Sequence, residues 1–200
     1  FYFTNEPAKV KNLDTYNSFL NLHPPITKND FSLNLFYSEN CHSFYEENGN
    51  FISNLGVFIY KKQWNNKAIR LFYEDFKNLS SLERLLLSED VHGQFLLILY
   101  YENRFFLITD RLGYFSAYCY TNGKTIDVSN SILILAKNNK TTLSNQGIAE
   151  YLSENYRWGT YACCDKNIFE EIEYLDAGSI YTFDKEVINK QQYFNVKEQL

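Results

Sequence analysis

The stretch "FLLILYY" at residues 95–101 carries an apolar or aromatic side chain at every position. Successive side chains of a β-strand point to opposite faces, so this strand is apolar on both faces and needs cover on both. Two stacked sheets with helices outside would supply that cover, and so would a parallel sheet with helices on either side. Because the neighbouring strands are joined by short turns rather than helices, the sequence favours antiparallel sheets.

Two β-hairpins are predicted around this stretch. Residues 93–110 contain an apolar run, the polar tripeptide "ENR" and a second apolar run. Residues 114–131 turn at Asn122-Gly123, a dipeptide typical of tight hairpin turns. Alternation and chain breakers predict further strands at the start of the chain before Pro7, at 31–40, 55–62 and 69–76, and after Gly178.

Three helices are predicted from the spacing of apolar residues. Residues 79–91 place leucines on one helical stripe, and Ser80 with Glu83 resembles a capping box. Residues 131–138, "SILILAKN", predict a short helix. Residues 142–156 predict a third helix with Ser144 as its N-cap. The side chains expected on its inward face are Ile148, Tyr151, Leu152 and Tyr156.

The gross composition excludes several classes of protein. A length of 200 residues with 45% hydrophobic side chains predicts one globular domain over 1–200. A net charge of −5 without a basic stripe argues against nucleic-acid binding. We find no signal peptide, and the apolar runs are too short to span a bilayer. The expected location is therefore cytoplasmic, without a membrane partner.

The four cysteines are Cys41, Cys119, Cys163 and Cys164. They form no CxxC pair and no metal-ligand spacing with the histidines, so no metal site is predicted. Cys119 lies in an aromatic strand and is interpreted as a small buried side chain. The neighbours Cys41 and His42 would point to opposite faces of a strand, which argues against a catalytic dyad.

Charged residues interrupt the apolar pattern at "ITDRLGYFSAYCY" (108–120), where Asp110 and Arg111 are followed by Gly113. A buried carboxylate next to a guanidinium can satisfy many hydrogen bonds at a sharp bend. Glycine permits a backbone conformation that other residues avoid. We therefore predict that Asp110, Arg111 and Gly113 form a structural corner and are not catalytic.

A series of motifs follows in a fixed order. Gly93-Gln94-Phe95 precedes "DRLGYFSAYCY", "VSNSILILAKN", "LSNQGIAEYL" and "NIFEEIEYLDAGSIYTF", and Tyr193-Phe194 ends the series. This order resembles the N-terminal glutaminase domain of the asparagine synthetase family. Such domains are class II glutamine amidotransferases of the N-terminal-nucleophile (Ntn) type. The resemblance implies an α+β fold, a four-layer αββα sandwich of two mostly antiparallel sheets.

The resemblance implies a glutaminase site whose working parts are missing here. The family hydrolyses glutamine with the thiolate of a cysteine at residue one, whereas this chain has Phe1. Where "SSLE" resembles the family's "G-S-D-x-E", Ser81 replaces the aspartate that holds the glutamine amine, and Glu83 is kept. The family's arginine loop and the Asn-Gly pair of its oxyanion hole have no counterpart. We therefore expect a degenerate pocket at Phe1, Ser81 and Glu83, with no catalytic residue.

Similar degeneration occurs in β-lactam synthetases and in the macrolactam synthetases of lasso peptides. The resemblance thus implies a non-catalytic domain, the N-terminal part of a longer ATP-dependent amide-forming enzyme. No cofactor is expected in this chain, whereas ATP and Mg²⁺ are expected for the synthetase domain. The expected partners are that C-terminal domain or a separate synthetase subunit, with a peptide or small-molecule carboxylate as substrate. Residues 157–178 are the expected contact surface.

Two alternatives remain open. The chain could be a working glutaminase domain whose cysteine preceded Phe1, since the sequence does not begin with methionine. It could also be an unrelated aromatic-rich module that binds carbohydrate or protein, because tyrosines and asparagines are frequent. In that case Trp64 and Trp158, both in polar stretches, would be exposed in a shallow groove.

Overall fold

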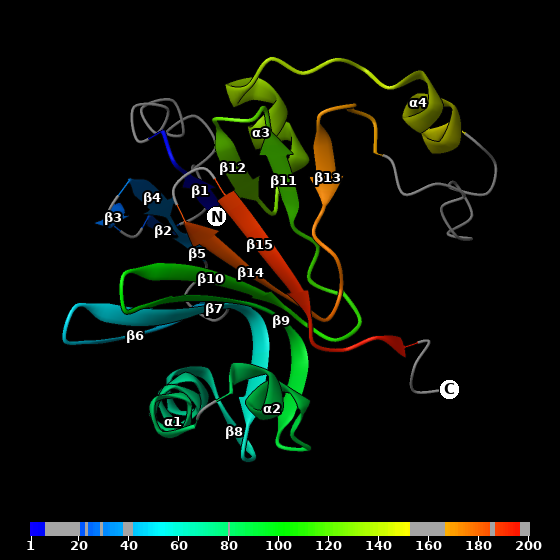
Figure 1. Ribbon diagram of the computed structural model, residues 1–200. Coiled ribbons are helices and arrows are strands. Elements are labelled where there is room, and N and C mark those ends of the chain that lie inside the picture. Colours follow the sequence, from blue (N-terminus) through cyan, green and yellow to red (C-terminus); the bar gives the residue numbers. More distant parts are fainter. Residues whose placement is uncertain are drawn as a thin grey trace. The chain divides into compact units, whose positions relative to one another are not determined.

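The computed structural model describes residues 1–6, 21–22, 24–28, 30–37, 42–79, 81–152, 167–184 and 187–196. The chain divides into two compact units, each with one larger sheet (Figure 1). Unit 1 comprises Phe1–Asp14, Pro24–Leu35 and Ser116–Leu175, and unit 2 comprises Thr15–His23, Phe36–Phe115 and Asp176–Leu200. Strand pairing in both sheets is antiparallel throughout the described residues. The predicted α+β class with two mostly antiparallel sheets is therefore observed.

The sheet of unit 2 consists of β6 (His42–Glu47), β7 (Asn50–Tyr60), β8 (Gln63–Trp64), β9 (Val91–Tyr101), β10 (Arg104–Thr109), β14 (Ser179–Asp184) and β15 (Val187–Gln192). The strand order is β15-β14-β10-β9-β7-β6, with β8 beside β7. β9 and β10 form the hairpin predicted over 93–110, and β14 follows Gly178 as predicted. The strand predicted at 55–62 is the second half of β7.

Strand β9 lies in the interior of this sheet and is buried on both faces. Leu96 and Ile98 point to one face and Leu97 and Leu99 to the other, and all four are 0% exposed. This burial explains the two-sided apolar pattern of residues 95–101. Removing each such side chain from water stabilises the fold by about 1.5–3 kcal/mol.

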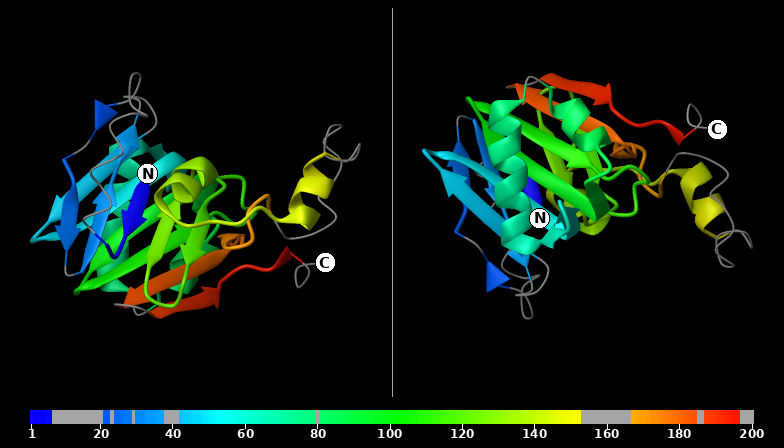
Figure 2. Two further views of the ribbon diagram at one scale, coloured as in Figure 1. Left: turned by 90° about the horizontal axis from the view of Figure 1, so that it is seen from above. Right: turned by 90° about the horizontal axis from the view of Figure 1, so that it is seen from below.

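Helices α1 (Asn65–Asn78) and α2 (Leu82–Leu87) cover one face of this sheet (Figure 2). Phe72 of α1 and Leu86 of α2 belong to the same buried cluster as Leu97 and Leu99. Helix α2 lies within the helix predicted over 79–91, but its N-cap is Ser81. The predicted cap, Ser80, lies outside the described residues.

The strand predicted over 69–76 is wrong, because these residues belong to α1. The buried residues of α1 recur at intervals of three or four and form one helical face, namely Ala68, Ile69, Phe72 and Tyr73. Arg70 and Glu74, one turn apart on another face, form an ion pair. Aromatic residues usually favour strands, but here the packing of a helical face on the sheet overrides that local preference.

The sheet of unit 1 consists of β1 (Tyr2–Thr4), β3 (Ile26–Lys28), β4 (Phe31–Asn34), β11 (Tyr118–Thr121), β12 (Ile126–Ser129) and β13 (Ile172–Tyr174). The strand order is β13-β11-β12-β1-β4-β3, so the first strand of the chain lies between β12 and β4. β11 and β12 form the hairpin predicted around Asn122-Gly123. The side-chain oxygen of Asn122 closes that turn by accepting the amides of Lys124 and Thr125.

The strand predicted over 31–40 is interrupted at Leu35. Its first part is β4, and the next described strand is β5 (Phe36–Tyr37), which pairs with β2 (Asn21–Leu22) in a separate two-stranded sheet. Leu35 itself is fully buried. The apolar alternation predicted a strand here but could not locate the point where its pairing partner changes.

One face of the unit 1 sheet is polar and yet buried. Tyr2 and Thr4 of β1 lie on it beside Asn34 and Asp127 of the neighbouring strands, and none of these is more than 1% exposed.

Helix α3 (Ile132–Asn138), predicted at 131–138, contacts β11, β12 and β13. Just after it, the Asn139 amide donates to the Asp127 carboxylate at 2.7 Å. This hydrogen bond partly offsets the cost of burying a charge.

Helix α4 (Asn145–Tyr151) begins at the predicted N-cap, because the Ser144 hydroxyl accepts the amide of Gly147 at 3.2 Å. Gly147 is the buried residue of this helix. A Cβ at this position would lie 1.9 Å from the carbonyl oxygen of Asn167. The absence of a side chain therefore lets α4 approach the backbone at Asn167.

The prediction of an inward apolar face on α4 is wrong for two residues. Tyr151 and Leu152 are 51% and 69% exposed. Ile148 is half-buried, and Tyr156 lies outside the described residues. The N-terminal turn of the helix and its close approach at Gly147 fix its position against the backbone at Asn167.

Candidate functional site

The Asp110 carboxylate organises the bend that follows β10. It is 1% exposed. One oxygen accepts the amides of Leu112 at 3.0 Å and Tyr114 at 3.1 Å, and the other accepts the amide of Phe115 at 2.9 Å. Hydrogen bonds to a charged acceptor contribute about 1.5–3 kcal/mol each. Because three backbone amides of its own loop occupy this carboxylate, it is suited to fixing a bend and poorly suited to moving a proton.

The Arg111 guanidinium binds a different part of unit 2. One of its terminal nitrogens donates to the carbonyl oxygens of Leu86 and Ser88, each at 2.7 Å. These carbonyls belong to the C-terminal end of α2, where a positive charge is favourable. The Phe194 ring lies over the guanidinium, 5.7 Å from its carbon to the ring centroid. No ion pair joins Asp110 to Arg111 among the described side chains.

Gly113 has a left-handed backbone, with φ of +67°. A Cβ there would lie 3.1 Å from the Cβ of Ala177, which is closer than side-chain carbons normally approach. The backbone carbonyl oxygen of Asp110 accepts two further hydrogen bonds, from the amides of Gly113 at 3.2 Å and Gly178 at 2.8 Å. The bend and residues 177–178 are therefore fixed against each other.

Two residues that the sequence did not single out for this bend, Thr109 and Tyr193, also hold it. The Thr109 hydroxyl donates to the carbonyl of Asp176 at 2.7 Å and accepts the amide of Ser179 at 3.0 Å. The Tyr193 hydroxyl donates to the Thr109 carbonyl at 2.8 Å, and burial raises the pKa of this phenol. Tyr193-Phe194 is the last motif of the series in the sequence. The hydrogen-bond partner of Tyr193 is Thr109, 84 residues earlier, and the sequence alone could not identify it.

Phe1 lies in unit 1 and is 3% exposed. Its amino nitrogen donates to the side-chain oxygen of Asn130 at 2.7 Å, and its carbonyl accepts the hydroxyl of Ser129 at 2.6 Å. The phenyl ring of Phe1 offers no nucleophile.

Ser81 and Glu83 lie together at the start of α2 in unit 2. The Ser81 hydroxyl accepts the amide of Arg84 at 3.4 Å, which caps the helix. The Glu83 carboxylate accepts the side-chain amide of Gln191 at 2.8 Å. Phe1 belongs to the other unit, so the degenerate pocket expected at Phe1, Ser81 and Glu83 stays a prediction.

Cys119 is the one cysteine within the described residues, and it is 8% exposed. Burial raises the pKa of its thiol to about 12, with smaller contributions from the carboxylates of Glu173 and Asp127. Such a thiol stays protonated near neutral pH and is a poor nucleophile. Cys41, Cys163 and Cys164 lie outside the described residues, so the Cys41–His42 pair cannot be placed.

Metal-binding and membrane-spanning features are absent from the part of the chain that the structure describes. No three His, Cys, Asp or Glu side chains come together there in a way that could hold a metal ion. None of the described helices has the length and apolar character needed to cross a membrane.

Most of the aromatic side chains described are packed in the interior, as Tyr60, Phe72 and Tyr100 illustrate. Trp64 is 69% exposed where α1 begins, whereas Trp158 lies outside the described residues. The shallow groove expected around Trp64 and Trp158 in a binding module therefore stays a prediction.

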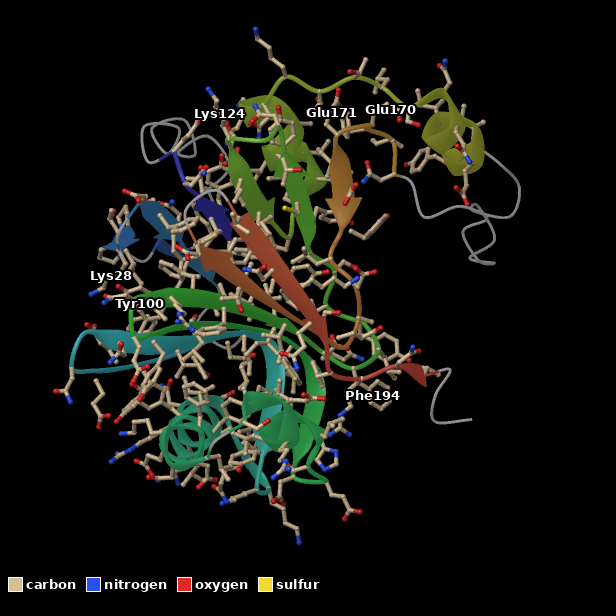
Figure 3. The ribbon with its side chains drawn as sticks, viewed as in Figure 1. Lys28, Tyr100, Lys124, Glu170, Glu171 and Phe194 are labelled. Atoms are coloured by element: carbon tan, nitrogen blue, oxygen red, sulfur yellow. The ribbon has the colours of Figure 1, made fainter. Side chains whose placement is uncertain are left out.

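The contact surface expected at 157–178 is described from residue 167 onward. Glu170 and Glu171 lie just before β13, as Figure 3 shows. The Glu171 carboxylate accepts the backbone amide of Thr142 at 2.7 Å. Within β13, Tyr174 is 48% exposed. Whether this surface meets a partner stays a prediction.

No family model matches the sequence, and no curated protein matches it. Among solved structures, glutamine phosphoribosylpyrophosphate (PRPP) amidotransferase from B. subtilis, complexed with ADP and GMP, is similar with a TM-score of 0.37 and 10% identity, over 75% of this chain and 31% of that chain. A structure of the allosteric regulatory enzyme of purine biosynthesis is similar with a TM-score of 0.38 and 8% identity, over 74% of this chain and 30% of that chain. Both likenesses are distant, and this chain spans less than a third of either protein.

Proposed function

We propose that this chain is a glutaminase-like domain that does not hydrolyse glutamine and that supports an ATP-dependent, amide-forming synthetase of the asparagine synthetase type. The observation that carries the proposal is the bend at Asp110. The motif through which the sequence resembles that family is a corner in which the buried Asp110 carboxylate accepts three backbone amides. A corner of this kind is expected where the scaffold of an enzyme is kept after its chemistry is lost.

The order of elements supports the same proposal. The hairpin β9–β10, the Asp110 bend, the hairpin β11–β12 and helices α3 and α4 follow one another along the chain. Strands β13 and β14 and the pair Tyr193-Phe194 come next. The motifs by which the sequence resembles the family fall on these elements in the same order. This order of elements is not expected for an unrelated aromatic-rich binding module.

The chemistry of the described side chains supports the loss of activity. Glutamine hydrolysis of the Ntn type needs a thiolate beside an amine that can take its proton. Cys119, the one cysteine within the described residues, is buried with a raised thiol pKa. Ser81, which takes the place of the family's aspartate, caps a helix. Neither Cys119 nor Ser81 is therefore expected to take part in glutamine hydrolysis.

The proposal assigns the chemistry to a synthetase partner, either a domain of the same polypeptide or a separate cytoplasmic subunit. That partner would bind ATP and Mg²⁺, activate a carboxylate of a peptide or small molecule as an adenylate, and form an amide with an amine. Pyrophosphate leaves in the first step and AMP in the second, so the atoms balance without glutamine. No ammonia is required from this domain.

Glutamine turnover tests the loss of activity directly. The chain is incubated with glutamine and ammonia release is followed, and in parallel it is treated with a diazoketone analogue of glutamine and its intact mass is measured. We expect no ammonia above the blank and no adduct. A Cys119→Ala variant is the matched control and should behave identically. Turnover together with an adduct on a cysteine would contradict the proposal and favour a working glutaminase domain.

Pyrophosphate exchange tests the synthetase partner. The complete product of the gene that encodes this chain is assayed for exchange of labelled pyrophosphate into ATP with candidate carboxylates and Mg²⁺. We expect exchange that depends on the carboxylate. A gene product, or a co-purifying subunit, without an adenylating domain would contradict this part of the proposal.

A further inference from the structure

The polar face of the unit 1 sheet contains buried groups that make no hydrogen bond to the protein. Three buried atoms have no hydrogen-bond partner among the described residues, namely the hydroxyl oxygen of Tyr2 and the side-chain nitrogens of Asn34 and Asn138. Tyr2 is 0% exposed and Asn34 is 1% exposed. A polar group that leaves water without gaining a partner destabilises the fold, so buried polar groups nearly always have one.

Three elements of unit 1 bring these atoms to one region. Tyr2 of β1 lies directly opposite Asn34 of β4 in the antiparallel ladder, so their side chains are neighbours on the polar face. Asn138 is the last residue of α3, which contacts β12 on the other side of β1. Its side chain comes close to the Tyr2 hydroxyl, and so do those of Thr4 and Asp127. The hydroxyl therefore has polar neighbours but completes a hydrogen bond to none of them.

The chemistry of these groups limits what can lie beside them. The two amide nitrogens only donate, whereas the Tyr2 hydroxyl both donates and accepts. Burial and the nearby Asp127 carboxylate raise the pKa of Tyr2, so the phenol keeps its proton. Amide N–H groups disfavour a metal cation, and the carboxylate disfavours an anion. A small neutral molecule that accepts from the amides and also donates is the best match.

We infer that ordered water is bound in this part of unit 1 and joins Tyr2, Asn34 and Asn138 through hydrogen bonds. Buried water molecules make about three hydrogen bonds each, to polar groups that the protein itself leaves unpaired. Water bound here attaches the end of α3 to the first strand of the chain. It also lets a polar strand be buried without loss of hydrogen bonds. The inference concerns how this fold is held together and does not depend on the proposed function.

Removal of the Tyr2 hydroxyl tests the inference by the sign of the change. If the hydroxyl binds water, Tyr2→Phe loses that hydrogen bond, and the urea midpoint of unfolding should fall. If the hydroxyl is unpaired, Tyr2→Phe removes a destabilising group, and the midpoint should rise. A rise would overturn the inference. Tyr60→Phe is the matched control, because Tyr60 is also buried and its hydroxyl donates to Asp75 at 2.6 Å, so its midpoint should fall in either case.

Magnetic relaxation dispersion of the solvent detects the water itself, because only long-lived internal water molecules contribute to its amplitude. We expect a smaller amplitude for Asn138→Leu than for the unmodified chain. Asn78→Leu, at the exposed last residue of α1, is the control and should leave the amplitude unchanged. Tyr2→Phe, which keeps the ring, gives the same test if Asn138→Leu does not fold. An unchanged amplitude in the variants would overturn the inference, even with a lower urea midpoint, because Tyr2 would then bond directly to a neighbouring side chain.

A monovalent cation is the rival occupant, since both asparagine amides could be turned so that their oxygens point inward. Urea midpoints in sodium, potassium and choline chloride at equal ionic strength separate the two occupants. Bound water predicts the same midpoint in sodium and potassium and no loss in choline. A midpoint that is lower in choline than in sodium or potassium would overturn the assignment to water.

Discussion

Asp110 and Arg111 are neighbours in sequence, yet their side chains bind different parts of unit 2. The carboxylate accepts the amides of its own loop, whereas the guanidinium donates to the carbonyls of Leu86 and Ser88. The first set of bonds shapes the bend, and the second attaches it to α2. The charged pair in an apolar stretch is therefore explained by two separate structural tasks.

Replacing Asp110 should show how strongly the bend depends on its carboxylate. Asp110→Ala leaves three amides without their acceptor and is expected to cost about 3 kcal/mol or more of unfolding free energy. Asp110→Asn keeps one side-chain oxygen and should cost clearly less. Urea unfolding followed by circular dichroism measures both values. Equal costs for the two variants would mean that the carboxylate oxygens do not act as separate acceptors.

A double-mutant cycle should confirm that the two charged side chains act independently. Arg111→Met removes the donor to Leu86 and Ser88 and is expected to cost about 1–3 kcal/mol. Combined with Asp110→Asn, the two costs should add to within about 0.5 kcal/mol, because the side chains share no partner. A coupling energy well above that value would indicate that Asp110 and Arg111 form an ion pair in solution.

Gly147 should resist a substitution that normally stabilises a helix. Alanine is favoured over glycine inside helices by about 1 kcal/mol. At this position, however, the new methyl group would meet the Asn167 carbonyl, so Gly147→Ala is expected to destabilise unit 1 by about 1–3 kcal/mol. The matched control is Gln146→Ala, at an exposed position of the same helix, which should change stability by less than about 0.5 kcal/mol. Thermal unfolding measures the stability of both variants. A Gly147→Ala variant more stable than the unmodified chain would contradict the close approach of α4 to the Asn167 carbonyl.

The free energy of unfolding should fall as the pH rises above 9.0, the ordinary pKa of a cysteine thiol. Burial raises the pKa of Cys119 from 9.0 to about 12, so the unfolded chain releases this proton first. Between these two values the unfolded state binds fewer protons, and the free energy of unfolding decreases with rising pH by up to about 1.4 kcal/mol per unit. Cys119→Val removes this contribution while the buried tyrosines continue to contribute theirs. Unfolding free energies at three alkaline pH values should therefore decline less steeply for the variant, and parallel declines would refute the assignment.

The sequence was informative where the relevant contacts are local. The hairpins at 93–110 and 114–131 were predictable because an apolar run, a polar turn and a second apolar run are adjacent along the chain. Ser144 was predictable as an N-cap because its partner, Gly147, is three residues away. The two-sided burial of β9 followed from its composition alone.

The sequence was uninformative where packing between segments distant in the chain determines the local structure. The strand expected over 69–76 is a helix because its aromatic side chains meet the sheet at helical spacing. Tyr151 and Leu152, expected on the inward face of α4, are exposed, whereas Gly147, a residue without an apolar side chain, makes the close contact with the backbone at Asn167. The partners of Arg111 lie more than twenty residues earlier, and no local pattern reveals them.

The position of β1 has a consequence for how the protein forms. Tyr2 pairs with Ser129, so the opening strand waits for a partner synthesised more than a hundred residues later. One edge of β1 can pair early with β4, but the edge that faces β12 stays open until β12 has left the ribosome, and pairings of such long sequence separation form slowly. We would expect the nascent chain to be prone to aggregation in this interval and to benefit from a chaperone that shields an unpaired strand.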